Sequence, residues 1–92
     1  MEFQHICVIG LGYIGLPTSS LFASKGIRVT GVDSNPQVVE SLRQGKVHIF
    51  EPGLNEVVRE VLEKGLLEIA SQPVEADAFI IAVPTPFYGD KK

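Results

Sequence analysis

Hydrophobic residues follow two different spacings along this 92-residue chain. Short apolar runs, typical of largely buried strands, predict strands at Phe3–Ile9, Ile27–Val32, Leu66–Ala70 and Ala78–Val83. Longer stretches between these runs carry apolar residues at helical spacing. Because strands and helices alternate, the pattern predicts an α/β fold, with a mostly parallel sheet and helices on both of its faces.

The first predicted helix, Ile14–Lys25, comes soon after the first strand, and Gly26 is expected to end it. One side of this helix is expected to lie on the sheet, because a stripe of mostly apolar residues recurs along it at helical spacing. The stripe consists of Ile14, Thr18, Leu21, Phe22 and Lys25.

Two further helices are predicted between the second and third strands. One begins at Pro36, a favoured first helical residue, and ends at Gly45. The other begins near Pro52 and ends at Gly65. Its apolar face is complete and consists of Leu54, Val57, Val58, Val61 and Leu62. Pro73–Ala76 predicts a single helical turn before the last strand.

Three glycines with the spacing G-x-G-x-x-G lie between the first strand and the first helix. Gly10 allows a sharp turn out of the strand, because a glycine adopts positive φ at no steric cost. Gly12 lets backbone N–H groups approach a pyrophosphate, and Gly15 lets the helix pack closely on the strand. The start of the helix adds free N–H groups and the positive end of a dipole. The motif predicts the phosphate site of a dinucleotide on a Rossmann-like fold.

An acidic residue follows the second strand, where this kind of site binds ribose. The carboxylate of Asp33 is expected to accept hydrogen bonds from the adenosine ribose hydroxyls. The same charge repels a 2′-phosphate, and no Arg or Lys occupies positions 34–37, so NAD is favoured over NADP. The alternative is that Asp33 only caps the next helix, but Ser34 and Asn35 can already do so.

The loop after the last strand is the second predicted contact with the cofactor. In open α/β sheets, ligands bind beyond the carboxyl ends of the strands, which places Thr85 beside the glycine loop. Pro84 and Pro86 are expected to stiffen this loop. If the strand order is 3-2-1-4, the strand Ala78–Val83 has an unpaired edge, and we expect self-association through it.

Composition excludes several other classes of protein. With 45% hydrophobic residues, 21% charged residues and a net charge of −3, the chain lacks the basic surface that nucleic acids require. No apolar run reaches the length of a membrane span, and no secretion signal is visible. The only cysteine, Cys7, lies inside the first strand, where we expect an inert hydrophobic residue; a lone cysteine agrees with a cytoplasmic setting.

Four motifs, spread over nearly all of the chain, resemble the nucleotide-sugar dehydrogenases, or UDP-glucose/GDP-mannose dehydrogenase family. These motifs are Gly10–Pro17, Gly31–Asp33, Glu51–Leu54 and Val83–Pro86. The stretches His48–Pro52 and Ala82–Phe87 look most like the UDP-N-acetylmannosamine dehydrogenase branch. The resemblance implies a two-step, four-electron oxidation of a sugar alcohol to a uronic acid, with NAD as the oxidant.

By this resemblance, the family's cofactor contacts fall on Tyr13, Ile14, Asp33 and Thr85. Some relatives carry a lysine early in the second helix, near the adenosine, where this chain has Val38. The family's catalytic cysteine and its sugar-nucleotide domain belong to segments beyond residue 92. The resemblance therefore implies that residues 1–92 are an incomplete N-terminal NAD-binding domain, truncated after about four strands and without catalytic residues.

Two other functions stay open at this point. The chain could belong to another dehydrogenase class, such as a 3-hydroxyacid dehydrogenase, although Glu51–Leu54 and Pro84–Pro86 argue against this. It could also be a non-enzymatic nucleotide-sensing or interaction module, since the fold alone does not decide function. A P-loop is excluded, because Leu16 and Pro17 stand where that motif requires Lys and Ser or Thr.

Overall fold

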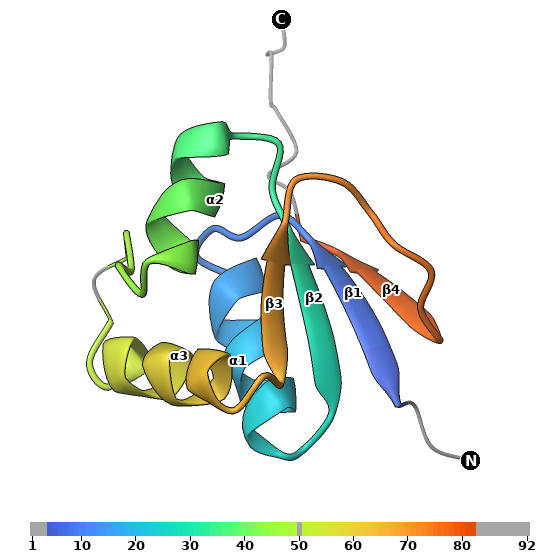
Figure 1. The fold of residues 1–92 in the computed structure, drawn as a ribbon, viewed down its shortest axis with the longest axis horizontal. Helices are drawn as coiled ribbons and strands as arrows, with labels where there is room; N and C mark the ends of the chain where they lie inside the picture. The colour runs from blue at the N-terminus through green and yellow to red at the C-terminus, as the bar shows by residue number, and fades with distance from the viewer. Residues whose placement is uncertain (1–3, 50, 83–92) are drawn as a thin grey trace, which may run out of the picture.

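Four parallel strands form a single sheet in the computed structural model, which describes residues 4–49 and 51–82. The strands are β1 (His5–Ile9), β2 (Arg28–Val32), β3 (Leu67–Ala70) and β4 (Ala78–Ile81). Their order across the sheet is β3-β2-β1-β4 (Figure 1), and each neighbouring pair is parallel. The Rossmann-like α/β class is therefore confirmed, and the strand order is the 3-2-1-4 on which the expected unpaired edge depended.

The three helices of the described residues lie together on one side of this sheet (Figure 1), and not on both faces as the pattern predicted. They are α1 (Gly15–Ser24), α2 (Pro36–Arg43) and α3 (Leu54–Glu63). The crossovers from β1 to β2 and from β2 to β3 advance in the same direction, so right-handed connections place their helices on the same face. Alternate strand residues point toward the helices and share one core with them. Among these strand residues are Ile6, Val8, Val29, Leu67 and Ile69.

The sheet-facing side of α1 differs from the predicted stripe. Ile14 and Leu21 are 68% and 55% exposed, whereas the fully buried positions include Leu16, Ser19 and Ala23. The prediction was wrong because it ranked positions by hydrophobicity, while the close approach of helix and sheet selects small residues. Gly15 is the reason for that approach, since it lies directly against the carbonyl group of Gly10.

Two buried serines on α1 are compatible with this packing because their hydroxyls are satisfied within the helix. Ser19 Oγ donates to the carbonyl oxygen of Gly15 at 2.7 Å, and Ser20 Oγ donates to that of Leu16 at 2.9 Å. A buried hydroxyl without such an acceptor is destabilising. Serine therefore serves here as a small residue that can be buried.

The connection between β3 and β4 contains no helical turn, so the prediction at Pro73–Ala76 was wrong. Because β3 and β4 lie at opposite edges of the sheet, residues 71–77 must cross three strand spacings, about 14 Å. Because the two strands are parallel, the same residues must also return from the end of β3 to the start of β4, about 13 Å along the strand direction. Seven residues reach about 25 Å at most when extended, which leaves no length for a compact helical turn. The segment ends at Asp77, whose N–H donates to the His5 carbonyl at 2.8 Å.

The ends of α2 and α3 follow the sequence signals. Asn35 caps α2, since its Oδ1 accepts the N–H of Gln37 at 2.9 Å, and Pro36 is the first helical residue. The helix α3 begins after Gly53 and buries Leu54, Val58 and Val61, as its stripe predicted. Gly26, Gly45 and Gly65 each follow a helix end with positive φ. These ends fix where the chain returns to the sheet.

The strand β4 lies at the edge of the sheet, and within residues 4–49 and 51–82 no strand pairs with its outer side. Ala78 and Ile80 pack against the core. Phe79 and Ile81 alternate with them on the face opposite the helices and are 52% and 70% exposed. This strand therefore presents an unpaired edge together with apolar side chains.

Candidate functional site

The glycine loop, residues 10–15, connects the carboxyl end of β1 to α1. Gly10 turns the chain with φ 101°, and its N–H donates to the Val32 carbonyl at 2.7 Å, which ties the loop to β2. A Cβ on Gly15 would lie 1.6 Å from the carbonyl oxygen of Gly10. Gly10 is therefore required by the turn, and Gly15 by the close contact between helix and strand, as the motif predicted.

The outer part of the loop is open. A Cβ on Gly12 would meet nothing within 4 Å, and Tyr13 and Ile14 are 75% and 68% exposed. Within the described residues, the N–H groups of positions 12–15 donate to no protein acceptor. Free N–H groups at a helix start beside an open glycine form the kind of cradle that a pyrophosphate fits.

Asp33 lies beside this loop and is bonded to it. Its Oδ2 accepts the N–H of Leu11 at 3.0 Å, and its Oδ1 accepts the N–H of Asn35 at 2.9 Å. These two bonds fix the plane of the carboxylate, while each oxygen keeps further capacity to accept a hydrogen bond. The residue does not cap α2, because Asn35 does so. The sequence prediction had foreseen the position of Asp33 but not its bond to the loop.

A cavity of about 190 Å³ opens at this end of the sheet, beside the loop and the carboxylate. Its lining joins the ends of three strands and consists of Ile9, Gly10, Val32, Asp33, Ser34, Ser71 and Pro73. The connection after β3 supplies the last two residues, which sequence reasoning had not assigned to a site. Their contribution follows from the strand order, since β3 lies next to β2.

The buried side chain of Leu11 anchors the glycine loop to the core. Its side chain is fully buried against Gly31, where an added Cβ would lie 2.8 Å from Leu11 Cδ2. Its carbonyl oxygen lies 2.9 Å from Nε2 of His48, on the connection between α2 and α3. Sequence reasoning missed this contact, because 37 residues separate the two positions and no local pattern links them.

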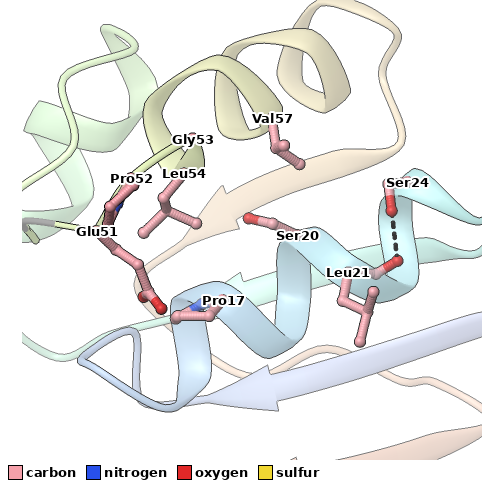
Figure 2. Close-up of a pocket in the computed structure, with 9 residues that line it drawn as sticks. All are labelled: Pro17, Ser20, Leu21, Ser24, Glu51, Pro52, Gly53, Leu54 and Val57. Atoms are coloured by element: carbon pink, nitrogen blue, oxygen red, sulfur yellow. Dashed lines mark hydrogen bonds between the residues drawn. The ribbon is translucent and has the colours of Figure 1, made fainter.

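A larger cavity, of about 330 Å³, lies between α1 and the start of α3 (Figure 2). Leu21, Leu54 and Val57 contribute apolar side chains, and the Ser24 hydroxyl is bonded back to the Leu21 carbonyl at 2.7 Å. Glu51 also lines this cavity, but neither the glycine loop with its free N–H groups nor the Asp33 carboxylate bonded to it belongs to the lining. The chemistry therefore favours the smaller cavity as the ligand site.

The other residues singled out in the sequence have different outcomes. Thr85 lies outside the described residues, so its contact with the cofactor stays a prediction. Cys7 is free and fully buried in β1, which agrees with a structural role. In the described part of the chain, no group of three or more acidic, His or Cys residues could bind a metal, and no helix is long and apolar enough to cross a membrane.

The fold and the site together define a dinucleotide-binding domain of the Rossmann type. Residues 4–92 match the UDP-glucose/GDP-mannose dehydrogenase family, NAD binding domain. The chain therefore belongs to this family and corresponds to its NAD-binding domain, with NAD as the cofactor.

Individual relatives agree with this assignment. The UDP-N-acetyl-D-mannosamine dehydrogenase of Campylobacter jejuni is 57% identical over 89 residues, which are 97% of this chain and 22% of that protein. The enzyme of the same name from Escherichia coli K12 is 54% identical over 90 residues, 98% of this chain and 21% of the relative. The chain thus spans about a fifth of the length of the curated relatives that it matches.

Solved structures of the family share the fold. The UDP-N-acetyl-mannosamine dehydrogenase of Staphylococcus aureus superposes with a TM-score of 0.87 at 54% identity, over 89% of this chain and 20% of that one. A GDP-mannose dehydrogenase from Pseudomonas aeruginosa gives 0.83 at 30% identity, over 88% and 20% of the two chains. The described fold is therefore that of the matching part of solved nucleotide-sugar dehydrogenases.

Proposed function

We propose that this chain is the N-terminal NAD-binding part of a nucleotide-sugar 6-dehydrogenase that oxidises a UDP-linked sugar, UDP-N-acetylmannosamine, to its uronic acid. The observation that carries the proposal is the Asp33 carboxylate, which is bonded to the glycine loop and lies on the cavity beside it. Support for the sugar comes from relatives at 54–57% identity, each named a UDP-N-acetyl-D-mannosamine dehydrogenase.

In this proposal the loop binds the pyrophosphate of NAD. The open space at Gly12 admits the phosphates, and the N–H groups of Tyr13 and Ile14 donate to them at the start of α1. The close contact between Gly10 and Gly15 fixes the conformation of the turn. Thr85, which lies outside the described residues, is proposed to add a further contact with the cofactor.

The adenosine ribose is assigned to Asp33. Its two oxygens, already oriented by backbone N–H groups, accept the ribose hydroxyls. A 2′-phosphate brings negative charge against this carboxylate, and positions 34–37 offer no base to offset it. The adenine is expected in the cavity next to Ser71 and Pro73.

The chemical step is not assigned to these residues. NAD accepts a hydride from the sugar carbon when it is bound, but within the described residues the only thiol belongs to Cys7, which is fully buried. A buried thiol in a strand cannot reach a substrate. We propose that the 92 residues bind the cofactor and that the remaining length seen in the relatives supplies the nucleophile and the sugar-binding surface.

A chimera tests this function directly. If residues 4–92 replace the matching segment of the Campylobacter jejuni enzyme, the chimera is expected to reduce two NAD molecules per UDP-N-acetylmannosamine, because the two segments are 57% identical over 89 residues. The chain alone is expected to form no NADH with the same substrate. NADH is followed by its absorbance.

Three results would argue for another function. Turnover by the isolated chain would contradict the absence of catalytic residues. A folded chimera that binds NAD but does not oxidise the sugar would favour another dehydrogenase class. A folded chimera without NAD binding would favour the nucleotide-sensing or interaction module, because the domain would then lack the family's cofactor function.

We also propose that the 92-residue chain self-associates through β4. Its outer edge is unpaired in the described residues, and the adjacent Phe79 and Ile81 are exposed. The variant Ile81→Lys is expected to reduce the sedimentation coefficient to that of a monomer, because a lysine on an edge strand opposes pairing. Leu21→Lys is the matched control on α1 and is expected to leave association unchanged. A stable, dilute monomer of the unaltered chain would contradict the proposal.

A further inference from the structure

Three contacts immobilise the backbone N–H, the backbone carbonyl and the side chain of Leu11. The N–H donates to Asp33 Oδ2 at 3.0 Å, the carbonyl oxygen lies 2.9 Å from His48 Nε2, and the isobutyl group is fully buried over Gly31. Since a carbonyl oxygen only accepts, the Nε2 of His48 carries the proton and donates it. Asp33 and Gly31 both belong to the end of β2, whereas His48 comes from a separate segment.

His48 is not held in place by being buried. The residue is exposed overall, on a connection without helix or strand, and only its ring reaches the glycine loop. Its neighbour Ile49 is 7% exposed and belongs to the core, so the connection is anchored beside the site. The imidazole therefore makes a directed polar contact from a fixed point of the backbone.

The carbonyl oxygen of Leu11 is the acceptor that the N–H of Gly15 would use if the helical hydrogen bonds of α1 extended back into the loop. The next bond of this kind does form, since the N–H of Leu16 donates to the carbonyl oxygen of Gly12 at 3.1 Å. In the described residues, however, the carbonyl oxygen of Leu11 accepts from His48 and not from Gly15. The histidine thus holds this oxygen by a hydrogen bond, while the N–H of Gly15 stays outside the helical bonding.

We propose that His48 is a positioning residue of the dinucleotide site: it holds the Leu11 carbonyl so that the N–H groups of the glycine loop stay directed at the pyrophosphate. This inference rests on the proposed NAD site. It assigns His48 no contact with the cofactor and no proton transfer. It predicts that the contribution of His48 concerns the phosphates and not the adenosine, which Asp33 holds.

Two substitutions in the full 92-residue chain test this role. His48→Leu removes the donor and keeps an apolar side chain, whereas His48→Gln places an amide N–H near the position of Nε2. Calorimetric titration with NAD is expected to show a dissociation constant roughly three- to tenfold higher for His48→Leu, and a nearly unaltered one for His48→Gln. Adenosine, which has no phosphate, is expected to bind all three chains alike.

A second readout requires no ligand. Amide hydrogen exchange at positions 11–15 is expected to accelerate in His48→Leu and to stay as in the unaltered chain in His48→Gln. Equal NAD affinity and equal exchange in all three chains would overturn the role of His48. So would an equal loss of NAD affinity in His48→Leu and His48→Gln. A loss of adenosine affinity in His48→Leu as large as its loss of NAD affinity would overturn it as well. A failure of the NAD site itself looks different, because the unaltered chain would then give no heat with NAD.

Discussion

Replacing Gly15 by alanine is expected to destabilise the fold by about 3 kcal/mol or more, which lowers the midpoint of thermal unfolding by at least about 12 °C. The new Cβ would lie 1.6 Å from the Gly10 carbonyl oxygen and 3.3 Å from the Cβ of Ala82. The nearest obstacle is backbone, which cannot rotate away as a side chain can. The helix must therefore separate from β1. Circular dichroism against temperature measures the change.

Gly12→Ala is the matched control for this substitution. Its Cβ would meet no protein atom within 4 Å, so the melting temperature is expected to stay within a few degrees of the unaltered value. NAD affinity is nevertheless expected to fall, because the methyl group enters the space assigned to the pyrophosphate. If Gly12→Ala melts as early as Gly15→Ala, or if it binds NAD normally, the assignment of the loop is wrong.

Asp33→Asn is expected to raise the dissociation constant for NAD by roughly ten- to a hundredfold. The carboxylate accepts N–H groups on both oxygens, from Leu11 at 3.0 Å and from Asn35 at 2.9 Å. An amide offers one oxygen and one NH₂ group, so one of these N–H groups loses its acceptor and faces another donor. The variant therefore loses a ribose acceptor and also loosens the loop. Calorimetry with NAD measures the effect.

Asp77 provides the control for a general loss of stability. Its Oδ2 accepts the N–H groups of Gln4 and His5 at 2.9 and 3.0 Å, at the amino end of the sheet and far from the loop. Asp77→Ala removes the acceptor of both N–H groups, so it is expected to lower stability by about 1–3 kcal/mol and to leave NAD affinity unaltered. Equal losses of affinity in both variants would show that Asp33 acts on the fold and not on the cofactor.

Sequence reasoning predicted the parts of this fold that depend on local patterns. The G-x-G-x-x-G motif, the acidic end of β2 and the glycines after the helices each leave a signal within a few residues, and the structure places them where expected. The strand order 3-2-1-4, which was only a condition of the expected unpaired edge, is the order observed.

The errors concern features that depend on tertiary contact. Hydrophobicity predicted Ile14 and Leu21 toward the sheet, but the contact between Gly15 and Gly10 sets the rotation of α1 and turns small residues inward. The absent turn at Pro73–Ala76 follows from the distance between β3 and β4, which no local pattern encodes. The bonds from Asp33 and His48 to Leu11 bridge 22 and 37 residues and are visible only in space.

The central claim is that the glycine loop and Asp33 form an NAD site that rejects NADP. Side-by-side calorimetric titration of the unaltered chain with NAD and NADP tests this claim most directly. NAD is expected to bind saturably although weakly, because these residues contact mainly its adenosine and pyrophosphate. NADP is expected to bind at least about tenfold more weakly, because its 2′-phosphate meets the carboxylate. Equal or tighter binding of NADP, or tight NAD binding that survives Asp33→Asn, would contradict the account.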